Sequence, residues 1–134
     1  MRTKQVVLSV LLVGIAILGQ GCVVAAVGLG AAGTIAYIRG DLEAIESEDI
    51  NAVYEASIQA AEELELRIIS KTKDALSATI IARDAQDKKV QIILRTTAEN
   101  TTKLSIRIGT FGSETKSRLI YQRIYDKLKK RQNT

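Results

Sequence analysis

The sequence predicts an α+β domain: a two-layer fold in which two helices cover one face of a four- to five-stranded, mainly antiparallel sheet. Four segments of alternating apolar and polar residues follow one another between residues 64 and 109, joined by short polar connectors, as antiparallel hairpins require. Amphipathic helical patterns lie on both sides of these segments. Charged residues are absent from Gln5 to Ile38 and frequent from Arg39 onward, so the domain is expected to occupy residues 40–134.

The domain is expected to open with a strand and a helix. Residues 41–47 (DLEAIES) predict a strand of mixed pattern. Residues 48–64 place apolar side chains at helical spacing, and Ser47 or Asp49 can cap this helix. The apolar positions of the helix are Ile50, Val53, Tyr54, Ile58, Ala61 and Leu64.

Four further strands and a last helix complete the order β-α-β-β-β-β-α. The residues expected to point inward from the strands are Leu64, Leu66 and Ile68, then Leu76, Ala78, Ile80 and Ala82, then Val90, Ile92 and Leu94, and finally Leu104, Ile106 and Ile108. The last helix is predicted from about Glu114 to Lys130, with Ser113 as its cap. Its inward residues are Leu119, Ile120, Ile124 and Leu128. Both helices must cover the apolar face of the sheet.

The opposite face of the sheet combines isoleucines with basic residues. It is expected to carry Arg67, Ile69, Thr79, Ile81, Arg83, Gln91, Ile93, Arg95, Lys103, Ser105 and Arg107. Such a surface can dock a partner, an anionic lipid or a glycan, and Arg83, Arg95 and Arg107 are its candidate binding residues. The alternative is a solvated face whose β-branched residues reflect strand propensity alone.

Residues 1–21 have the parts of a signal peptide. A basic start (MRTK) precedes an apolar core, Val6–Leu18, of the length that signal peptides use. Gly21 then stands directly before Cys22, the one cysteine in the chain. This arrangement resembles the bacterial lipobox, although Gly19 occupies the position where that motif usually has leucine. The alternative is that Cys22 is a small apolar residue within an uncut membrane helix.

The lipobox resemblance implies that Cys22 carries a diacylglycerol and an N-acyl chain, and that the mature protein begins there. Val23 stands where an aspartate would retain many such lipoproteins in the inner membrane, so the expected location is the outer membrane, facing the periplasm. Residues 22–39 form a Gly/Ala-rich segment. This segment is either a loose tether or a small-residue helix that inserts beside the lipid.

Composition excludes several kinds of chemistry. The chain has no histidine, and no cysteine follows Cys22, which excludes zinc, haem and histidine-based nucleophilic sites of the usual types. Without Arg2 and Lys4 the formal charge falls from +4 to +2, and aromatic residues are few, so a nucleic-acid partner is not expected. Apart from the lipid on Cys22, no cofactor is expected, and no enzymatic activity.

One turn remains as a candidate small-ligand site. The stretch Ile106–Arg118 (IRIGTFGSETKSR) joins the last strand to the last helix through Gly109 and Gly112. With Ser113 and Lys116 near the start of the helix, it could bind an anion. The alternative is a glycine turn followed by a capped helix, in which Glu114 already occupies the positive end of the helix dipole.

Three stretches together resemble a known family: AYIRGDLEA (Ala36–Ala44), VYEASIQAAEEL (Val53–Leu64) and LSIRIGTFGSETKSRLI (Leu104–Ile120). They are similar to a family of small Gram-negative bacterial lipoproteins known only as a domain of unknown function. The resemblance covers most of the mature chain and implies a lipid-anchored envelope domain, without an activity. Relatives often have Gly-Asp at the turn, where this chain has Gly112-Ser113.

The expected function is therefore that of a non-catalytic binding or structural module. Cys22 would hold the domain at the membrane and raise its effective concentration toward an envelope protein or glycan. A first alternative is an uncleaved inner-membrane protein anchored within residues 6–38. A second is a small-ligand or anion binder, or an enzyme, that uses the Gly109–Lys116 turn. The sequence does not indicate an oligomeric state.

Overall fold

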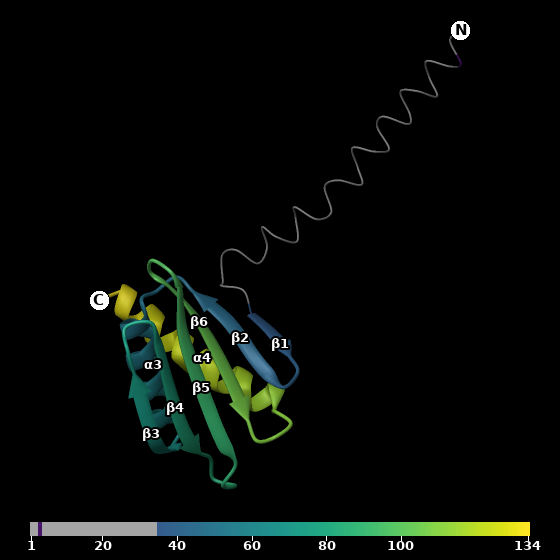
Figure 1. Cartoon of the computed structure of the whole chain (residues 1–134), viewed down its shortest axis with the longest axis vertical. Helices are drawn as coiled ribbons and strands as arrows, with labels where there is room; N and C mark the ends of the chain where they lie inside the picture. The colour runs from purple at the N-terminus through teal and green to yellow at the C-terminus, as the bar shows by residue number, and fades with distance from the viewer. Residues whose placement is uncertain (1–2, 4–34) are drawn as a thin grey trace. The chain divides into compact units, whose positions relative to one another are not determined.

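The computed structural model describes residue 3 and residues 35–134, which contain a six-stranded antiparallel sheet with two helices packed on it (Figure 1). The strands are β1 (Ile35–Ile38), β2 (Asp41–Glu46), β3 (Arg67–Lys73), β4 (Ser77–Arg83), β5 (Lys89–Ala98) and β6 (Thr101–Ile108). The helices are α3 (Ile50–Glu63) and α4 (Glu114–Gln132). Across the sheet the strands lie in the order β1-β2-β6-β5-β4-β3. The α+β fold class predicted from the sequence is confirmed.

The strand count differs from the prediction, because β1 is a sixth strand. It lies within the stretch that the sequence analysis assigned to the tether, and it pairs with β2 from Ile35 opposite Ala44 to Ile38 opposite Asp41. Arg39 and Gly40 between them both have positive φ, 53° and 91°, as a type I′ hairpin turn requires. A uniformly apolar strand shows no alternation, and the Arg-Gly pair was interpreted as a domain boundary rather than as this turn.

The core lies between the sheet and the helices. Leu42, Ile106, Ile92 and Ile80 stand side by side across four strands and are fully buried. From α3 and α4 the core receives Val53, Ala56, Ala60, Ile120, Ile124 and Leu128. Because apolar residues on the four central strands point the same way, the helices cover a single face and leave the other to solvent.

Two residues predicted to face inward are exposed. Leu76 is 66% exposed, because it lies in the β3–β4 turn, where the Asp74 carboxylate accepts its backbone N–H. Leu119 is 52% exposed, because the buried stripe of α4 runs along Ile120, Ile124 and Leu128 and leaves it to one side.

A β-bulge on β3 changes which side chains face the helices. Ile68 lies opposite Ala82 and Ser70 opposite Ile81, so Ile69 is the extra residue. Beyond it the alternation reverses, and Lys71 and Lys73 take positions opposite the core residues Ile80 and Ala78. The Lys73 ammonium accordingly lies 5.9 Å from the centre of the Tyr54 ring on α3.

Of the two predicted caps for the first helix, Asp49 is the one used. Its carboxylate accepts the backbone N–H groups of Asn51 and Ala52 at 2.7 and 3.0 Å. Predictions about residues 1–21, Cys22 and the segment up to residue 34 fall outside the described residues. Among the residues that are described, no helix is both long and apolar enough to cross a membrane.

Candidate functional site

A cleft of about 610 Å³ lies at the end of the sheet where the β4–β5 turn and the β6–α4 turn meet. Its walls carry four basic side chains, Arg83, Lys88, Lys89 and Arg107, and one carboxylate, that of Asp87. Gln91 and residues 108–113, at the end of β6 and in the β6–α4 turn, complete the lining. The lining is therefore strongly cationic.

Five of the seven candidate binding residues predicted within the domain line this cleft. These are Arg83, Arg107, Gly109, Gly112 and Ser113. Arg95 does not belong to it, because on β5 it lies opposite Ser77 and Lys103, toward the other end of the sheet. Lys116 does not line the cleft either and contributes instead to a second, smaller cavity.

Arg107 fastens the wall of the cleft to the first hairpin. Its Nη1 donates to the backbone oxygen of Arg39 at 3.0 Å and to Asp41 Oδ2 at 3.1 Å, and its Nη2 donates to the backbone oxygen of Thr110 at 2.6 Å. A guanidinium held by three partners on two turns keeps a fixed position. Its charge therefore stays at the cleft while the side chain has a structural role.

Gly112 is required for close packing of two turns. Its φ is +81°, and a Cβ there would stand 2.6 Å from both Gly40 Cα and the Tyr37 hydroxyl. Gly109 differs: its φ is +66°, but a Cβ would meet nothing within 4 Å. Its N–H donates to the Lys89 backbone oxygen at 2.8 Å, which joins the two turns on either side of the cleft.

Ser113 and Lys116 do not form a paired site. Ser113 occupies the N-cap position of α4 as predicted, but its side chain makes no capping hydrogen bond. The Lys116 ammonium donates to Asp84 Oδ2 at 2.8 Å and to Gln86 Oε1 at 2.5 Å. The predicted anion site at the start of the helix is therefore not assembled around Lys116.

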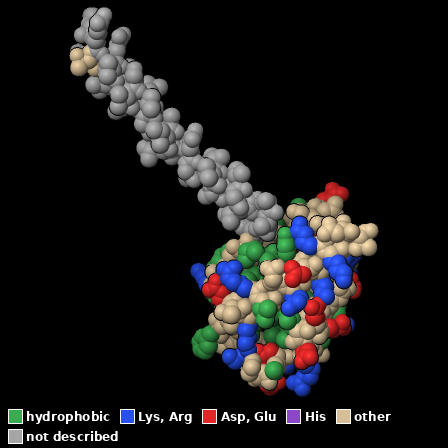
Figure 2. All heavy atoms as spheres, turned by 180° about the vertical axis from the view of Figure 1, so that it is seen from behind, with side chains coloured by type: hydrophobic (Ala, Val, Ile, Leu, Met, Phe, Trp, Pro, Cys, Tyr) green, Lys and Arg blue, Asp and Glu red, His purple; other side chains and the backbone are tan. Residues whose placement is uncertain are grey.

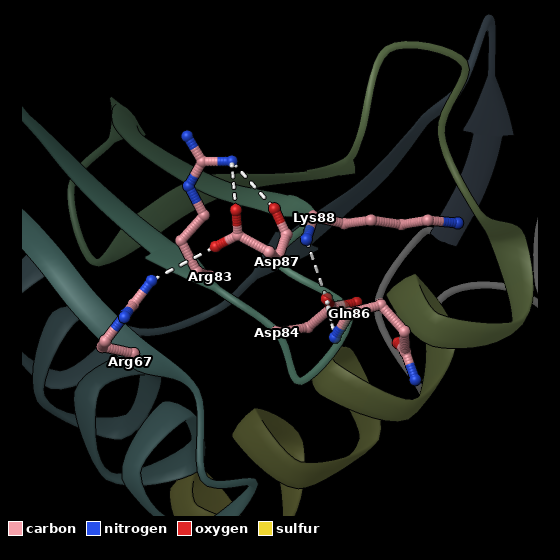
Figure 3. Close-up of polar contacts among 6 residues, drawn as sticks. All are labelled: Arg67, Arg83, Asp84, Gln86, Asp87 and Lys88. Atoms are coloured by element: carbon pink, nitrogen blue, oxygen red, sulfur yellow. Dashed lines mark hydrogen bonds and ion pairs between the residues drawn. The ribbon is translucent and has the colours of Figure 1, made fainter.

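Asp84 organises the β4–β5 turn. Its Oδ1 accepts the backbone N–H groups of Gln86 and Lys88, both at 2.9 Å (Figure 3). Its side chain is only 9% exposed. The hydrogen bond from Lys116, followed by those backbone bonds, holds the pKa of the Asp84 carboxyl below its ordinary value against the effect of burial.

Three cations stand in a row beside the cleft, and Asp87 is the carboxylate that faces them. Arg67 lies directly opposite Arg83, and Arg83 lies directly opposite Lys89. Asp87 Oδ1 is 3.2 Å from Arg67 Nη2, and Oδ2 is 4.0 Å from Arg83 Nη1 (Figure 3). Arg83 Nη1 also donates to the Asp87 backbone oxygen at 2.8 Å. We call Arg67, Arg83 and Lys89 the cation row.

Sequence reasoning did not place Asp87, Lys88 and Lys89 at the site. The signal that could have found them is hairpin register: with a turn over residues 84–88, Arg83 and Lys89 must lie opposite each other. That register brings the end of β4 and the start of β5 to the β6–α4 turn.

The comparison with protein families gives a match over nearly the whole chain. A family model described as "Protein of unknown function (DUF3568)" matches residues 5–127. The chain belongs to the DUF3568 family. The predicted resemblance to a domain of unknown function is thereby confirmed, and the DUF3568 match includes both Cys22 and the cleft. None of the curated proteins matches the chain.

The open face of the DUF3568 sheet is less cationic than the sequence suggests. Asp41 and Glu43 on β2 form ion pairs with Arg107 and Lys103 on β6, at 3.1 and 3.0 Å. Of the four basic residues that line the cleft, Arg107 therefore has an acidic partner on β2, and Arg83 contacts Asp87. On the other side of the molecule, where the helices lie behind the sheet of Figure 1, basic and acidic side chains are intermingled with apolar ones (Figure 2).

Proposed function

We propose that this DUF3568 protein is a lipid-anchored envelope protein whose domain acts as a non-catalytic binding module. The observation that carries the binding role is the cleft, which is lined by four basic residues: Arg107 is paired with Asp41, Arg83 contacts Asp87, and Lys88 and Lys89 complete the set. Its volume of about 610 Å³ lies within the range of roughly 300–1,000 Å³ that is usual for small-ligand sites.

The chemistry of the cleft supports binding rather than catalysis. Two of its four cations are arginines, which keep their protons in proteins and so do not act as general acids or bases. Lys116, the lysine of the predicted turn site, is engaged by Asp84 and Gln86 outside the cleft lining. The cleft thus offers fixed positive charge and hydrogen-bond donors.

The anchoring role is supported by the sequence around Cys22. The cysteine follows a basic start and an apolar core in the order of a lipoprotein signal. The family match includes this segment together with the domain. Acylation of Cys22 would restrict the domain to a membrane surface and raise its effective concentration toward envelope ligands.

The intact mass of the chain tests the anchor. The full-length chain is expressed in Gram-negative bacteria and extracted from membranes, with and without an inhibitor of lipoprotein signal peptidase. A chain that begins at Cys22 and carries acyl groups is expected, and Cys22→Ser should abolish acylation. Ser9→Ala, within the segment to be removed, is the matched control. A full-length, unacylated mass contradicts the anchor and favours the uncleaved inner-membrane alternative.

Amide hydrogen exchange tests the binding role. Exchange of residues 107–113 is compared between isolated native envelopes and the same chain purified in detergent. Slower exchange in envelopes is expected at the cleft, whereas the exposed residues Gln122 and Asp126 of α4 serve as an internal reference. Equal exchange of the cleft in the two preparations contradicts a bound ligand.

A further inference from the structure

We propose that the cleft binds the phosphate group of its ligand between Arg83 and Lys89, and that the Asp87 carboxylate, which contacts Arg83, competes with this phosphate in the free protein. This inference rests on the binding role proposed above and specifies the ligand class. Three observations carry it: the cation row, the exposed position of Asp87, and the exposed Phe111 ring at the rim of the cleft.

The cation row is an arrangement that stability alone does not favour. Like charges directly opposite each other on neighbouring strands destabilise a sheet, and here three cations adjoin across β3, β4 and β5. A single carboxylate, Asp87, contacts two of them. Arrangements that lower stability are typical of binding sites, so the row points to an anion with more than one negative charge.

Asp87 is positioned as a replaceable counter-ion. Its side chain is 72% exposed, and exposed ion pairs of this kind are weak. Its backbone has a φ of +61° and is held by a hydrogen bond from its N–H to the backbone oxygen of Asp84, at 2.9 Å. The turn therefore keeps its shape when the carboxylate moves. A phosphate can then bind the Arg83 guanidinium through two parallel hydrogen bonds.

The rim of the cleft suits an apolar or flat portion of the ligand. Phe111, one of the lining residues, is 91% exposed, whereas the side chain of Ile108 beside it is buried in the core. An exposed aromatic ring beside a cationic site can pack against a ring attached to the phosphate. The ligand class is therefore a phosphorylated molecule with a ring or apolar group close to the phosphate.

Phosphate of this kind can come from a soluble compound or from a lipid headgroup. The cleft lies at the end of the sheet where β6 finishes, whereas Ile35 lies opposite Ala44, part-way toward the other end. The chain therefore does not enter the domain at the cleft itself. The experiment includes a probe for each source.

The test uses the full-length chain in uncharged detergent, with amide chemical shifts of residues 107–113 as the readout. Inorganic phosphate and phenyl phosphate are the soluble probes, and micelles containing phosphatidic acid are the lipid probe, with diacylglycerol micelles as their control. Phenyl phosphate is expected to bind more tightly than inorganic phosphate. Phe111→Ala should remove that difference and leave inorganic phosphate binding unchanged.

Two charge variants with matched controls decide the assignment. Arg83→Gln should weaken phosphate binding about tenfold, the loss expected for hydrogen bonds to a charged group. Arg95→Gln makes the same change of charge at the other end of the same face, and binding should change less than about twofold. Asp87→Asn tolerates positive φ, removes the competing carboxylate and should tighten binding several-fold. Asp126→Asn, which removes an exposed charge on α4, should leave phosphate binding unchanged.

Each outcome has a definite meaning. If the soluble probes bind and the variants change their affinity as expected, the inference is supported with a soluble ligand. If phosphatidic acid micelles give the same response to the variants, a lipid headgroup is the source. No shift with any phosphate probe, or equal affinity in Arg83→Gln and Arg95→Gln, overturns the inference. If the chain is acylated and its cleft is protected in envelopes, but no phosphate probe binds, the proposed function stands and only the phosphate ligand class is overturned.

Discussion

Glu46 carries the buried carboxyl group through which the stability of the core depends on pH. It lies at the end of β2, only 6% exposed, and accepts a hydrogen bond from the Tyr121 hydroxyl at 2.5 Å. Burial raises the pKa of Glu46 above its ordinary 4.5, with Glu48 adding to the rise, while the Tyr121 hydrogen bond and Lys129 oppose it. Burial and Glu46 likewise raise the pKa of Tyr121.

This shift predicts how stability depends on pH. Because the folded protein holds the Glu46 proton more tightly than the unfolded chain, its stability falls as pH rises from about 4.5 through the raised pKa. Glu46→Gln should flatten this part of the profile, measured by urea unfolding between pH 4.5 and 7.5. Glu55→Gln, an exposed change on α3, should leave the profile as in the wild type.

Asp84 gives stability the opposite dependence on pH, and does so at lower pH. Its lowered pKa means that its contribution is present at neutral pH and is lost as pH falls below 3.8 through the folded value. Asp84→Asn should lower the free energy of unfolding at pH 7 by about 2 kcal/mol, because three hydrogen bonds to a charged group are weakened. Asp74→Asn, in the more exposed turn before β4, should have a smaller effect in the same urea titration.

At the level of elements, two glycines of one turn make different contributions. Gly112→Ala adds a Cβ against the backbone of Gly40 at positive φ, so a loss of about 3 kcal/mol is expected from overpacking and backbone strain together. Gly109→Ala strains only the backbone and should lose about 1 kcal/mol. Urea unfolding of both variants measures the difference. Equal losses would mean that the Gly40–Gly112 contact does not constrain the turn.

The elements that the sequence predicted are those whose patterns are locally complete. Strands β4, β5 and β6 alternate clearly, and Ala82, Ile92 and Ile106 are buried as expected. Leu64 and Leu66, predicted as strand residues, lie before β3. The reversal of β3 after Ile69 was not predictable, because the bulge depends on pairing with β4 and leaves no local signal. β1 was missed because its burial depends on β2 and on the packing of Gly40 against Gly112.

The candidate site was only partly predictable, for the same reason. Arg83, Arg107 and the two glycines were identified because their residue types stand out on a strand or in a turn. Lys116 was grouped with them because it is near in sequence, but its ammonium binds Asp84 on another hairpin. Asp87 could not be assigned to the site from the sequence, because its partner Arg67 is 20 residues away and the two meet only in the folded domain.

For the molecule as a whole, β1 decides where the folded domain begins. Ile35 and Tyr37 pack against the core, so a chain that starts at residue 40 should be about 2–3 kcal/mol less stable than one that starts at residue 34. It should also self-associate, because β2 becomes an exposed edge. Urea unfolding and light scattering measure the two effects. Equal stability would assign residues 35–38 to the preceding segment.

The fastening of the first hairpin also has a mechanical consequence. β1 is where the chain enters the domain, and its turn is held by Arg107 through Arg39 and Asp41, with Thr110 on the same guanidinium. A pull on the segment before Ile35 is therefore carried along the edge strand to Arg107, in the wall of the cleft. In an anchored protein, tension on the membrane attachment and occupancy of the cleft would act on the same side chain.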